Sequence, residues 1–470
     1  MKILLISPPR VSDISVGQTK FFSRNMAIFP PLSLLPLASF LHQESSHIAK
    51  VLDLAIERNP LQKLNSTIEN FTPEAVGITC MLNNWFVITQ ILQMVKHTFP
   101  KIKTVIGGYN TSEFPHESVQ NDHVDFMILG TGQVPLKELL DGLEKNSSDL
   151  SKIKGLFIHN SNKSSYDDEK LRINPDEYPF PDRGLVSINS YRSAISQRFP
   201  STVMISSDGC PFNCNFCNTS NMKNILIRDP IKVVDEMEEC VKIGIREIMF
   251  QDELFTIKKE RVLRISNEIL NRKLDIVWNF KSRINLIEED LLPILKKAGC
   301  NNIHFGIENG NDEILEKMNK GITTEKVLAV FAMLKKHKIP GSASFMLAYP
   351  SETRAQIENT IDFAIKLNPS YVQFSVTCDF PGSKIYLNSL ANGKYKEDIY
   401  KKFILKPTAD FTFPYSSELF TREELDNMLK HAYRKYYFRY GYIKRRLSSI
   451  KSPGQFINQA KIALGLFNNR

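Results

Sequence analysis

Residues 206–220 read SSDGCPFNCNFCNTS and hold three of the chain's seven cysteines within eight positions. The spacing is Cys-x3-Cys-x2-Cys, formed by Cys210, Cys214 and Cys217 directly after a predicted strand at 202–206. Three thiolates on one tight loop can hold three irons of a cubane cluster, because soft sulfur ligands suit iron–sulfur centres. With no fourth cysteine in the loop, one iron stays open to another ligand.

Two other interpretations of this loop stay open, a three-cysteine zinc site and cysteines that merely fill a core. A structural zinc ion needs a fourth Cys or His nearby, and core cysteines rarely cluster so densely. The odd cysteine count in a long chain argues against a disulfide framework. Among the rest, Cys240 and Cys300 are expected in the core, whereas Cys80 and Cys378 follow strands and could face a ligand.

From residue 196 to 395 short apolar runs alternate with helical patterns. The predicted strands are Thr202–Ser206, Glu247–Gln251, Ile276–Phe280, Asn302–Gly306, Ser342–Leu347 and Tyr371–Val376. Six such units over about 200 residues predict an incomplete (β/α) barrel, whose chemistry collects at the carboxyl ends of the strands. The cysteine loop follows the first of these strands.

Residues 1–145 show the same alternation and form a separate predicted domain. The predicted strands are Lys2–Ser7, Lys50–Asp53, Ala75–Thr79, Lys103–Ile106 and Phe126–Leu129. Parallel strands joined by helices predict an open doubly wound α/β sheet, which binds ligands beyond the carboxyl ends of its strands. Gly107-Gly108 and Gly130-Thr131-Gly132 lie at those ends.

The polar and proline-punctuated stretch 146–195 is predicted to be a linker, and 396–470 to be a helical, finally basic region. A chain of 470 residues with 42% hydrophobic and 24% charged residues is expected to form several globular domains. No apolar run approaches the length that crosses a bilayer, and the N-terminal run is too short for a secretory signal. We therefore expect a cytoplasmic protein.

The basic residues concentrate at the C-terminus. The whole chain has a net charge of +9, and residues 427–470 hold ten Lys or Arg and no Asp or Glu, so the remainder is close to neutral at −1. Tyrosines interleave with the basic residues over 430–451. We predict that 427–470 contacts an anionic membrane surface, with tyrosines at the headgroups. The alternative is a helix packed on the barrel with a solvated basic side, and the absence of a recognition motif argues against nucleic acid.

Cys210, Cys214 and Cys217, with the aromatic Phe216 before the third cysteine, resemble the cluster motif of the radical S-adenosylmethionine (SAM) superfamily. The resemblance implies a [4Fe-4S] cluster whose open iron chelates SAM, and reductive cleavage that releases a 5′-deoxyadenosyl radical. The residues expected to contact SAM lie in the motif or at barrel strand ends. They are Phe216, Asp252, Glu253, Ser282, Arg283 and Glu308.

The order of further motifs resembles one branch of this superfamily, the cobalamin-binding enzymes that include methyltransferases and anaerobic magnesium-protoporphyrin ester cyclases. The matching stretches are 30–35, 107–111, 305–310, 320–323, 349–353 and 380–383. The resemblance implies that the first domain binds cobalamin at its strand ends. The expected contacts are Thr79, Gly107, Gly108, Tyr109, Gly130 and Gly132.

The first domain departs from that branch in two ways. It has no Asp-x-His-x-x-Gly triplet, so no histidine is expected below the cobalt. Gly130-Thr131-Gly132-Gln133 stands where the branch usually has Gly-Glu-Gly-Glu, so both acids are missing. The alternative is a vestigial doubly wound domain without cobalamin.

The resemblance implies an enzyme that methylates an unactivated carbon, or phosphorus, of a small-molecule or lipid-like substrate. An external reductant such as flavodoxin or ferredoxin would supply the electron. The alternatives are a cobalamin-dependent oxidative cyclase or rearrangement enzyme, and a non-catalytic iron–sulfur or cobalamin sensor. No further catalytic residue is assigned from the sequence.

Overall fold

A computed structural model of the 470-residue chain describes residues 1–10, 27–108, 112–147, 149–161, 172–193, 196–221 and 225–448. The chain divides into two compact units. The first unit comprises the described parts of 1–14, 28–191 and 393–411, and the second those of 15–27, 192–392 and 412–470.

The first unit contains a six-stranded sheet in the order β3-β1-β4-β5-β6-β7. Its strands are β1 (Lys2–Ser7), β3 (Ile48–Asp53), β4 (Ala75–Thr79), β5 (Lys103–Gly107), β6 (Phe126–Ile128) and β7 (Leu156–Ile158). All neighbours pair in parallel except β6 and β7. The predicted doubly wound α/β sheet is confirmed.

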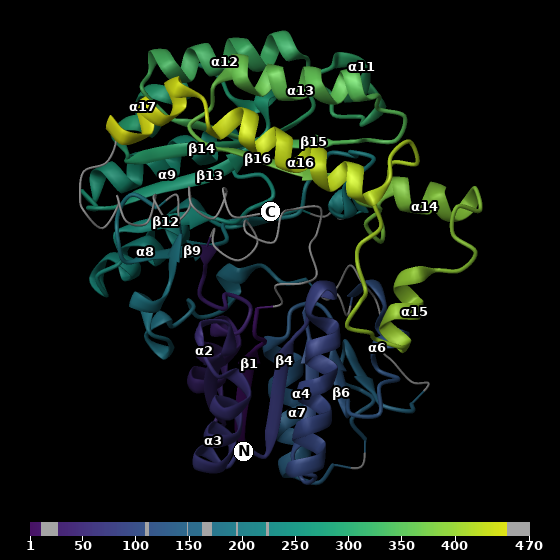
Figure 1. Ribbon diagram of the computed structural model, residues 1–470. Helices are drawn as coiled ribbons and strands as arrows, with labels where there is room; N and C mark the ends of the chain where they lie inside the picture. The colour runs from purple at the N-terminus through teal and green to yellow at the C-terminus, as the bar shows by residue number, and fades with distance from the viewer. Residues whose placement is uncertain are drawn as a thin grey trace. The chain divides into compact units, whose positions relative to one another are not determined.

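Helices flank this sheet (Figure 1). They are α2 (Leu35–Glu44), α3 (Pro60–Phe71), α4 (Trp85–Thr98), α6 (Pro115–Ser118), α7 (Gln133–Glu144) and α15 (Ile399–Leu405). One face of the sheet, with Ile3 and Val105, forms a core with Ala38 of α2 and Leu139 of α7. The apolar residues repeat at helical spacing in α2 and α7, so each helix buries one side on the strands.

The first unit extends beyond the predicted boundary at 145. Strand β7 lies within the predicted linker, and it pairs Leu156 with Ile128 at the sheet edge. Helix α15 lies in the predicted C-terminal region, yet Trp85 Nε1 donates to its Ile404 carbonyl at 3.0 Å. Both segments bury apolar side chains that would otherwise be exposed.

The second unit contains six parallel strands in the order β16-β15-β14-β13-β12-β9. They are β9 (Ser201–Met204), β12 (Glu247–Phe250), β13 (Val277–Ser282), β14 (Cys300–Glu308), β15 (Gly341–Leu347) and β16 (Val372–Val376). They form the predicted partial barrel. Four short strands are also described: β2 (Ala27–Ile28), β8 (Arg192–Ser193), β10 (Ser207–Asp208) and β11 (Leu226–Ile227).

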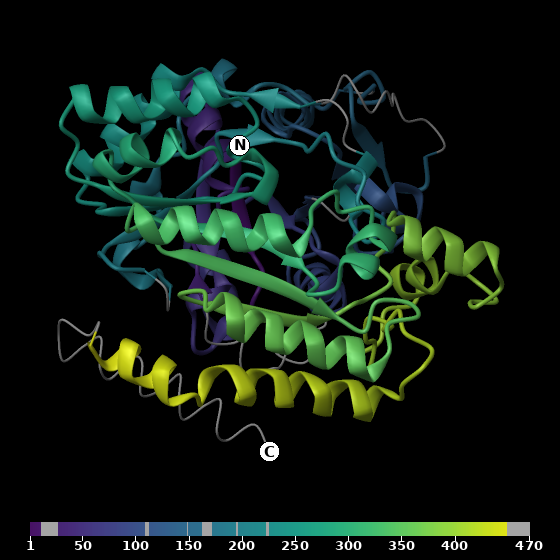
Figure 2. The same ribbon diagram turned by 90° about the horizontal axis from the view of Figure 1, so that it is seen from above.

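Helices cover the outer face of the partial barrel (Figures 1 and 2). They are α8 (Pro230–Lys242), α9 (Lys259–Asn271), α10 (Leu291–Lys297), α12 (Thr324–Lys336), α13 (Arg354–Leu367), α16 (Arg422–Tyr437) and α17 (Tyr440–Ser448). Two further helices, α11 (Asp312–Lys317) and α14 (Lys384–Ala391), contribute Ile314 and Ile385 to an apolar cluster beside Phe216 of the cysteine loop. Outward-facing aromatic residues fill this layer. Phe305 of β14 packs on Phe331 of α12, and Phe345 of β15 on Phe363 of α13.

Helix α16 runs along the edge strand β16 and beside α13 (Figure 2). The Tyr433 hydroxyl accepts from Phe374 N at 3.1 Å and donates to Phe374 O at 2.7 Å. The Tyr437 hydroxyl does the same for Val372, at 3.1 and 2.5 Å. These side chains satisfy the backbone groups that an edge strand would otherwise leave unpaired.

The prediction that the tail places its tyrosines at a membrane surface is therefore wrong for Tyr433, Tyr436 and Tyr437, which are at most 9% exposed. The alternative of a helix packed on the barrel describes α16, because the tyrosine side chains find their partners on β16 and at its start. Among the described residues, no helix is long and apolar enough to cross a membrane. Residues 449–470 of the tail lie outside the described residues.

We predict that Tyr433→Phe and Tyr437→Phe each lower the free energy of unfolding by about 1–3 kcal/mol. Each change leaves a buried backbone N–H and C=O without their partner. Chemical denaturation measures the effect. Tyr440, which is 79% exposed, provides the matched control, and Tyr440→Phe should change stability little. Equal stability of all three variants would contradict the edge-capping role.

Candidate functional site

A buried carboxylate anchors the start of the cysteine loop. Asp252, just beyond the end of β12, has no exposed surface. Its oxygens accept from Ser206 N at 2.7 Å, Ser206 Oγ at 2.5 Å and Ser207 Oγ at 2.8 Å. Arg261 of α9 also donates to the Ser206 carbonyl at 2.7 Å. These hydrogen bonds therefore fix the backbone at Ser206 and Ser207, shortly before the first cysteine.

The middle of the loop is held by the segment that follows α11. Asn215 N donates to Met318 O at 3.0 Å, and Asn215 Nδ2 to Lys317 O at 2.8 Å. Asn319 Nδ2 returns a bond to Asn213 O at 2.7 Å. Phe216 packs against an apolar cluster that includes Ile314. These contacts hold the turn that carries the second and third cysteines.

Arg283 follows β13 and reaches the cysteines directly. Its Nη1 donates to Cys214 Sγ at 3.1 Å, its Nη2 donates to Lys320 O, and its guanidinium lies 3.9 Å from the Phe212 ring centroid. The side chain is buried, and its Nε has no partner among the described residues. A guanidinium in this position stabilises a thiolate, the form of cysteine that binds metal.

The three sulfurs differ in exposure. Cys214 is buried, whereas Cys210 and Cys217 are half-buried. Burial raises the pKa of Cys210, and the nearby Arg283 acts in the opposite direction. Three thiols on one anchored loop, with a buried guanidinium beside them, fit a cluster that takes three protein ligands and keeps one open iron.

The other residues expected to contact SAM surround the loop. Glu253 is exposed and accepts from Gly209 N at 3.2 Å. Crowding by protein atoms raises the pKa of Glu253, and the carboxylates of Asp208 and Asp252 raise it further. Ser282 Oγ lies 2.5 Å from Thr256 Oγ1 and is buried. Among these residues, Glu253 presents an accessible carboxylate next to the first cysteine.

Glu308 lies at the end of β14 and forms an ion pair. Lys320 Nζ donates to its Oε1 at 2.8 Å, and the same ammonium lies 5.6 Å from the Phe216 ring centroid. A Cβ at Gly306 would meet Glu308 Oε1 at 2.3 Å, so a larger residue there would make the Glu308 carboxylate shift. The predicted SAM contacts are therefore brought to one end of the barrel, but most of them already have protein partners.

Sequence reasoning missed the residues that hold the loop. Lys320, Arg261 and Ser206 make contacts across long stretches of sequence, and none belongs to a recognisable metal-binding spacing. Cys80 and Cys378, which were expected to be able to face a ligand, are buried and at most 3% exposed. Burial raises the pKa of Cys378 to about 12.

The glycines predicted to contact cobalamin lie at the carboxyl ends of strands in the first unit. Gly108 follows β5 with φ +114°, and a Cβ there would meet Cys80 O at 2.8 Å and Thr79 Oγ1 at 3.0 Å. Thr79 Oγ1 accepts from Ser33 Oγ at 3.2 Å. Gly107 is half-buried and Gly108 exposed, so their backbone is accessible beyond the strand ends.

The second glycine pair lies at the neighbouring strand end. Gly130 is exposed with φ 71°, and Gly132 is the N-cap of α7. Thr131, which replaces an acid usual in the cobalamin-binding branch, accepts from Ile173 N at 2.9 Å. The two glycine-bearing segments follow the neighbouring strands β5 and β6, and they fit a large ligand bound beyond the carboxyl ends of these strands. Tyr109 lies outside the described residues.

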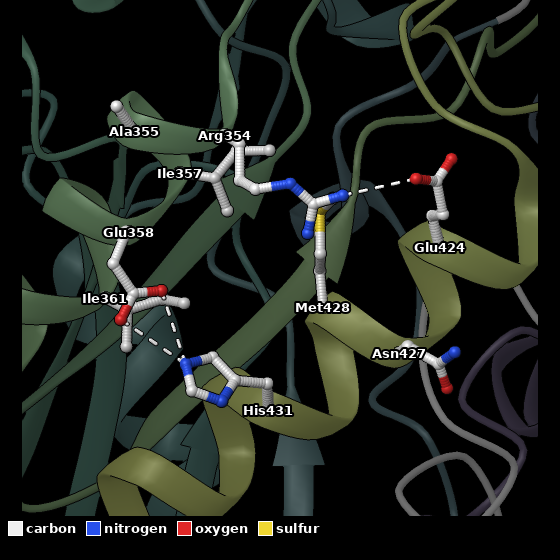
Figure 3. A pocket seen from close by; sticks show the side chains of 9 residues that line it. All are labelled: Arg354, Ala355, Ile357, Glu358, Ile361, Glu424, Asn427, Met428 and His431. Atoms are coloured by element: carbon white, nitrogen blue, oxygen red, sulfur yellow. Dashed lines mark hydrogen bonds and ion pairs between the residues drawn. The ribbon is translucent and has the colours of Figure 1, made fainter.

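A separate groove with a volume of about 740 Å³ lies between α13 and α16 (Figure 3). Arg354 pairs with Glu424 at 3.2 Å, and His431 with Glu358 at 3.3 Å. The groove shares no residue with the cysteine loop. Its charges pair with one another, so we assign it no part in the chemistry.

Comparisons with known proteins agree with this geometry. A model of the radical SAM superfamily matches residues 204–364, and a model of the B12 binding domain matches residues 27–140. An uncharacterized methyltransferase of Pyrococcus horikoshii, PH0819, is 32% identical over 93% of both chains. The chain belongs to the cobalamin-binding radical SAM enzymes.

A further relative and a solved structure are similar to this chain. The anaerobic magnesium-protoporphyrin IX monomethyl ester cyclase of Rubrivivax gelatinosus is 26% identical over 76% of this chain and 66% of its own length. The structure of the methyltransferase TsrM from Kitasatospora setae, with cobalamin and a [4Fe-4S] cluster bound, superposes with a TM-score of 0.70. The superposed region covers 92% of this chain and 90% of that chain at 17% identity. The similarity supports the fold described above.

We predict that Asp252→Ala lowers both the unfolding free energy, by about 3 kcal/mol or more, and the iron content after anaerobic reconstitution. The change leaves a buried amide and two hydroxyls without an acceptor at the start of the cysteine loop. Asp275→Ala is the matched control, because Asp275 is an exposed partner of Arg198. If Asp252→Ala kept the iron content of that control, the anchoring role would be wrong.

Proposed function

We propose that this protein uses a [4Fe-4S] cluster, SAM and cobalamin to methylate an unactivated carbon, or phosphorus, of a small-molecule substrate. The observation that carries the proposal is the alignment with a methyltransferase over 93% of both chains, together with matches to both cofactor domains. The relative at 26% identity is a cyclase, so a cobalamin-dependent cyclisation without methyl transfer is the second candidate.

The proposed roles of the residues follow from their positions. Cys210, Cys214 and Cys217 would hold the cluster, and Arg283 would stabilise the Cys214 thiolate through its 3.1 Å contact. Glu253 is the carboxylate that would accept from the SAM ammonium, because Asp252 is fully buried against the serines. Glu308 and Lys320 would order the adjoining rim as an ion pair.

The bound cofactors supply electron transfer to SAM and a carrier for the methyl group. The chain's own contribution is to hold the thiolates, orient SAM and line the barrel. Gly107, Gly108, Gly130 and Gly132, with Thr79, would contact cobalamin through accessible backbone.

An external reductant of the flavodoxin or ferredoxin type belongs to the same proposal. Peripheral membrane contact through 427–470 stays a prediction, supported now only by the basic side chains. The proposal of a lipid-like substrate depended on tyrosines at a membrane surface. Because those tyrosines are buried on the barrel, the proposed substrate class shifts towards small polar molecules.

The test is anaerobic incubation of the reduced, cobalamin-loaded protein with SAM bearing a deuterated methyl group and an extract of small metabolites. We expect 5′-deoxyadenosine and a product heavier by the labelled methyl group, measured by mass spectrometry. The variant with Cys210, Cys214 and Cys217 all changed to Ala should form neither. A product without the label would favour cyclisation, and no 5′-deoxyadenosine from the reduced wild-type protein would favour a non-catalytic sensor.

We also predict that bound cobalamin has no protein histidine below the cobalt, because the Asp-x-His-x-x-Gly triplet is missing. The optical spectrum of the reconstituted protein should be of the base-off type. A histidine-ligated spectrum would contradict this prediction. Failure to bind cobalamin despite an intact cluster would favour the vestigial domain.

A further inference from the structure

The inner face of the partial barrel carries polar side chains at one level of the sheet. Residues on a strand point alternately to its two faces. Phe305 and Phe345 point outward to the helices, so His304 and Ser344 point into the barrel. The register pairs Lys281 with His304, and His304 with Ser342. Lys281, His304 and Ser342 therefore lie side by side on neighbouring strands.

Lys281 contributes a positive charge to this inner face of the barrel. Its Nζ donates to the neutral Gln251 Oε1 at 3.1 Å. Among the residues that the structure describes, no carboxylate forms an ion pair with it. The closest candidates are engaged elsewhere, since Asp252 accepts from two serines and Glu253 accepts from Gly209 N. Burial lowers the pKa of Lys281, and the negative charges of Glu253 and Asp252 oppose that effect.

His304 beside it is neutral. Burial and then the Lys281 charge lower its pKa to about 4. Its Nδ1 lies 3.0 Å from Ser342 Oγ, and its Nε2 lies 2.7 Å from Ser344 Oγ. The imidazole and the hydroxyls thus provide neutral hydrogen-bonding groups around one ammonium. Lys281 is half-buried, and an ammonium that has lost part of its hydration is stabilised by an opposite charge beside it.

We propose that Lys281 binds an anionic group of the substrate, a carboxylate or a phosphate, inside the barrel, with Gln251 and His304 positioning it. The assignment rests on the proposed function, because it takes the barrel interior as the substrate site. It defines the substrate class as a molecule that carries a negative charge into the barrel. SAM also carries a carboxylate, so the experiment separates the two sources.

The test uses the full-length reconstituted protein and inorganic phosphate as the probe. Phosphate binding is measured from the shift of the thermal unfolding midpoint at constant ionic strength, since a ligand that binds only the folded state raises it. We expect Lys281→Gln to weaken phosphate binding by about tenfold or more, because it removes a charged hydrogen bond. Lys281→Arg should retain binding. Lys259→Gln is the matched surface control, because Lys259 is paired with Glu288 and Asp290.

A second measurement needs no variant. Limited acetylation of the wild-type protein, followed by peptide mass spectrometry, should modify Lys281 more slowly when phosphate is present and leave the rate at Lys259 unchanged. Equal phosphate binding by wild type and Lys281→Gln, no phosphate binding by wild type, or no protection of Lys281 would each overturn the proposal.

The SAM arm separates this inference from the proposed function. Lys281→Gln should bind SAM as wild type does and still release 5′-deoxyadenosine when reduced without substrate. A tenfold loss of SAM affinity in this variant would assign the anion to SAM itself and overturn the proposal. A further outcome is that Lys281→Gln loses phosphate binding while no protein, wild type included, cleaves SAM. This outcome would support the anion site and refute the catalytic function.

Discussion

The candidate site depends on the contacts that the buried guanidinium of Arg283 makes. It connects the end of β13, the Cys214 sulfur and the Lys320 carbonyl, and it stacks on Phe212 of the cysteine loop. A buried charge must have partners, so this one side chain constrains three parts of the chain at once. The loop can therefore carry closely spaced thiolates, whose mutual repulsion a positive charge offsets.

Asp252 provides the complementary constraint at the start of the loop. Its carboxylate accepts from Ser206 and Ser207, while Asn215 is held from the segment after α11. Asp252 follows β12, whereas the partners of Asn215 lie at the end of α11 and just after it. The barrel thus acts as a rigid frame, and a short irregular loop obtains a defined geometry from it. Lys281 lies on β13 and His304 on the neighbouring β14, so the same frame also positions polar side chains on the inner face of the barrel.

The alternating pattern was sufficient to predict both sheets, because buried parallel strands give short apolar runs between helices. The cysteine spacing was sufficient to locate the loop. The partners of Asp252, Arg283 and Glu308 could not be predicted, because they are chosen by three-dimensional packing between distant segments. The prediction for the tyrosines of α16 was wrong, because the same sequence pattern of tyrosines and basic residues is expected for a helix that contacts lipid headgroups and for one that packs on the backbone of an edge strand. Strand β7 was missed because its short apolar run lies within a polar stretch that has the composition of a linker.

The central claim is that the anchored loop holds a [4Fe-4S] cluster with one iron open to SAM. Electron paramagnetic resonance of the anaerobically reconstituted and reduced protein tests it most directly. We predict the signal of a reduced [4Fe-4S] cluster that changes on addition of SAM, because SAM becomes a ligand of the open iron. A cluster signal that SAM leaves unchanged, or a protein that binds zinc and no iron, would contradict the account.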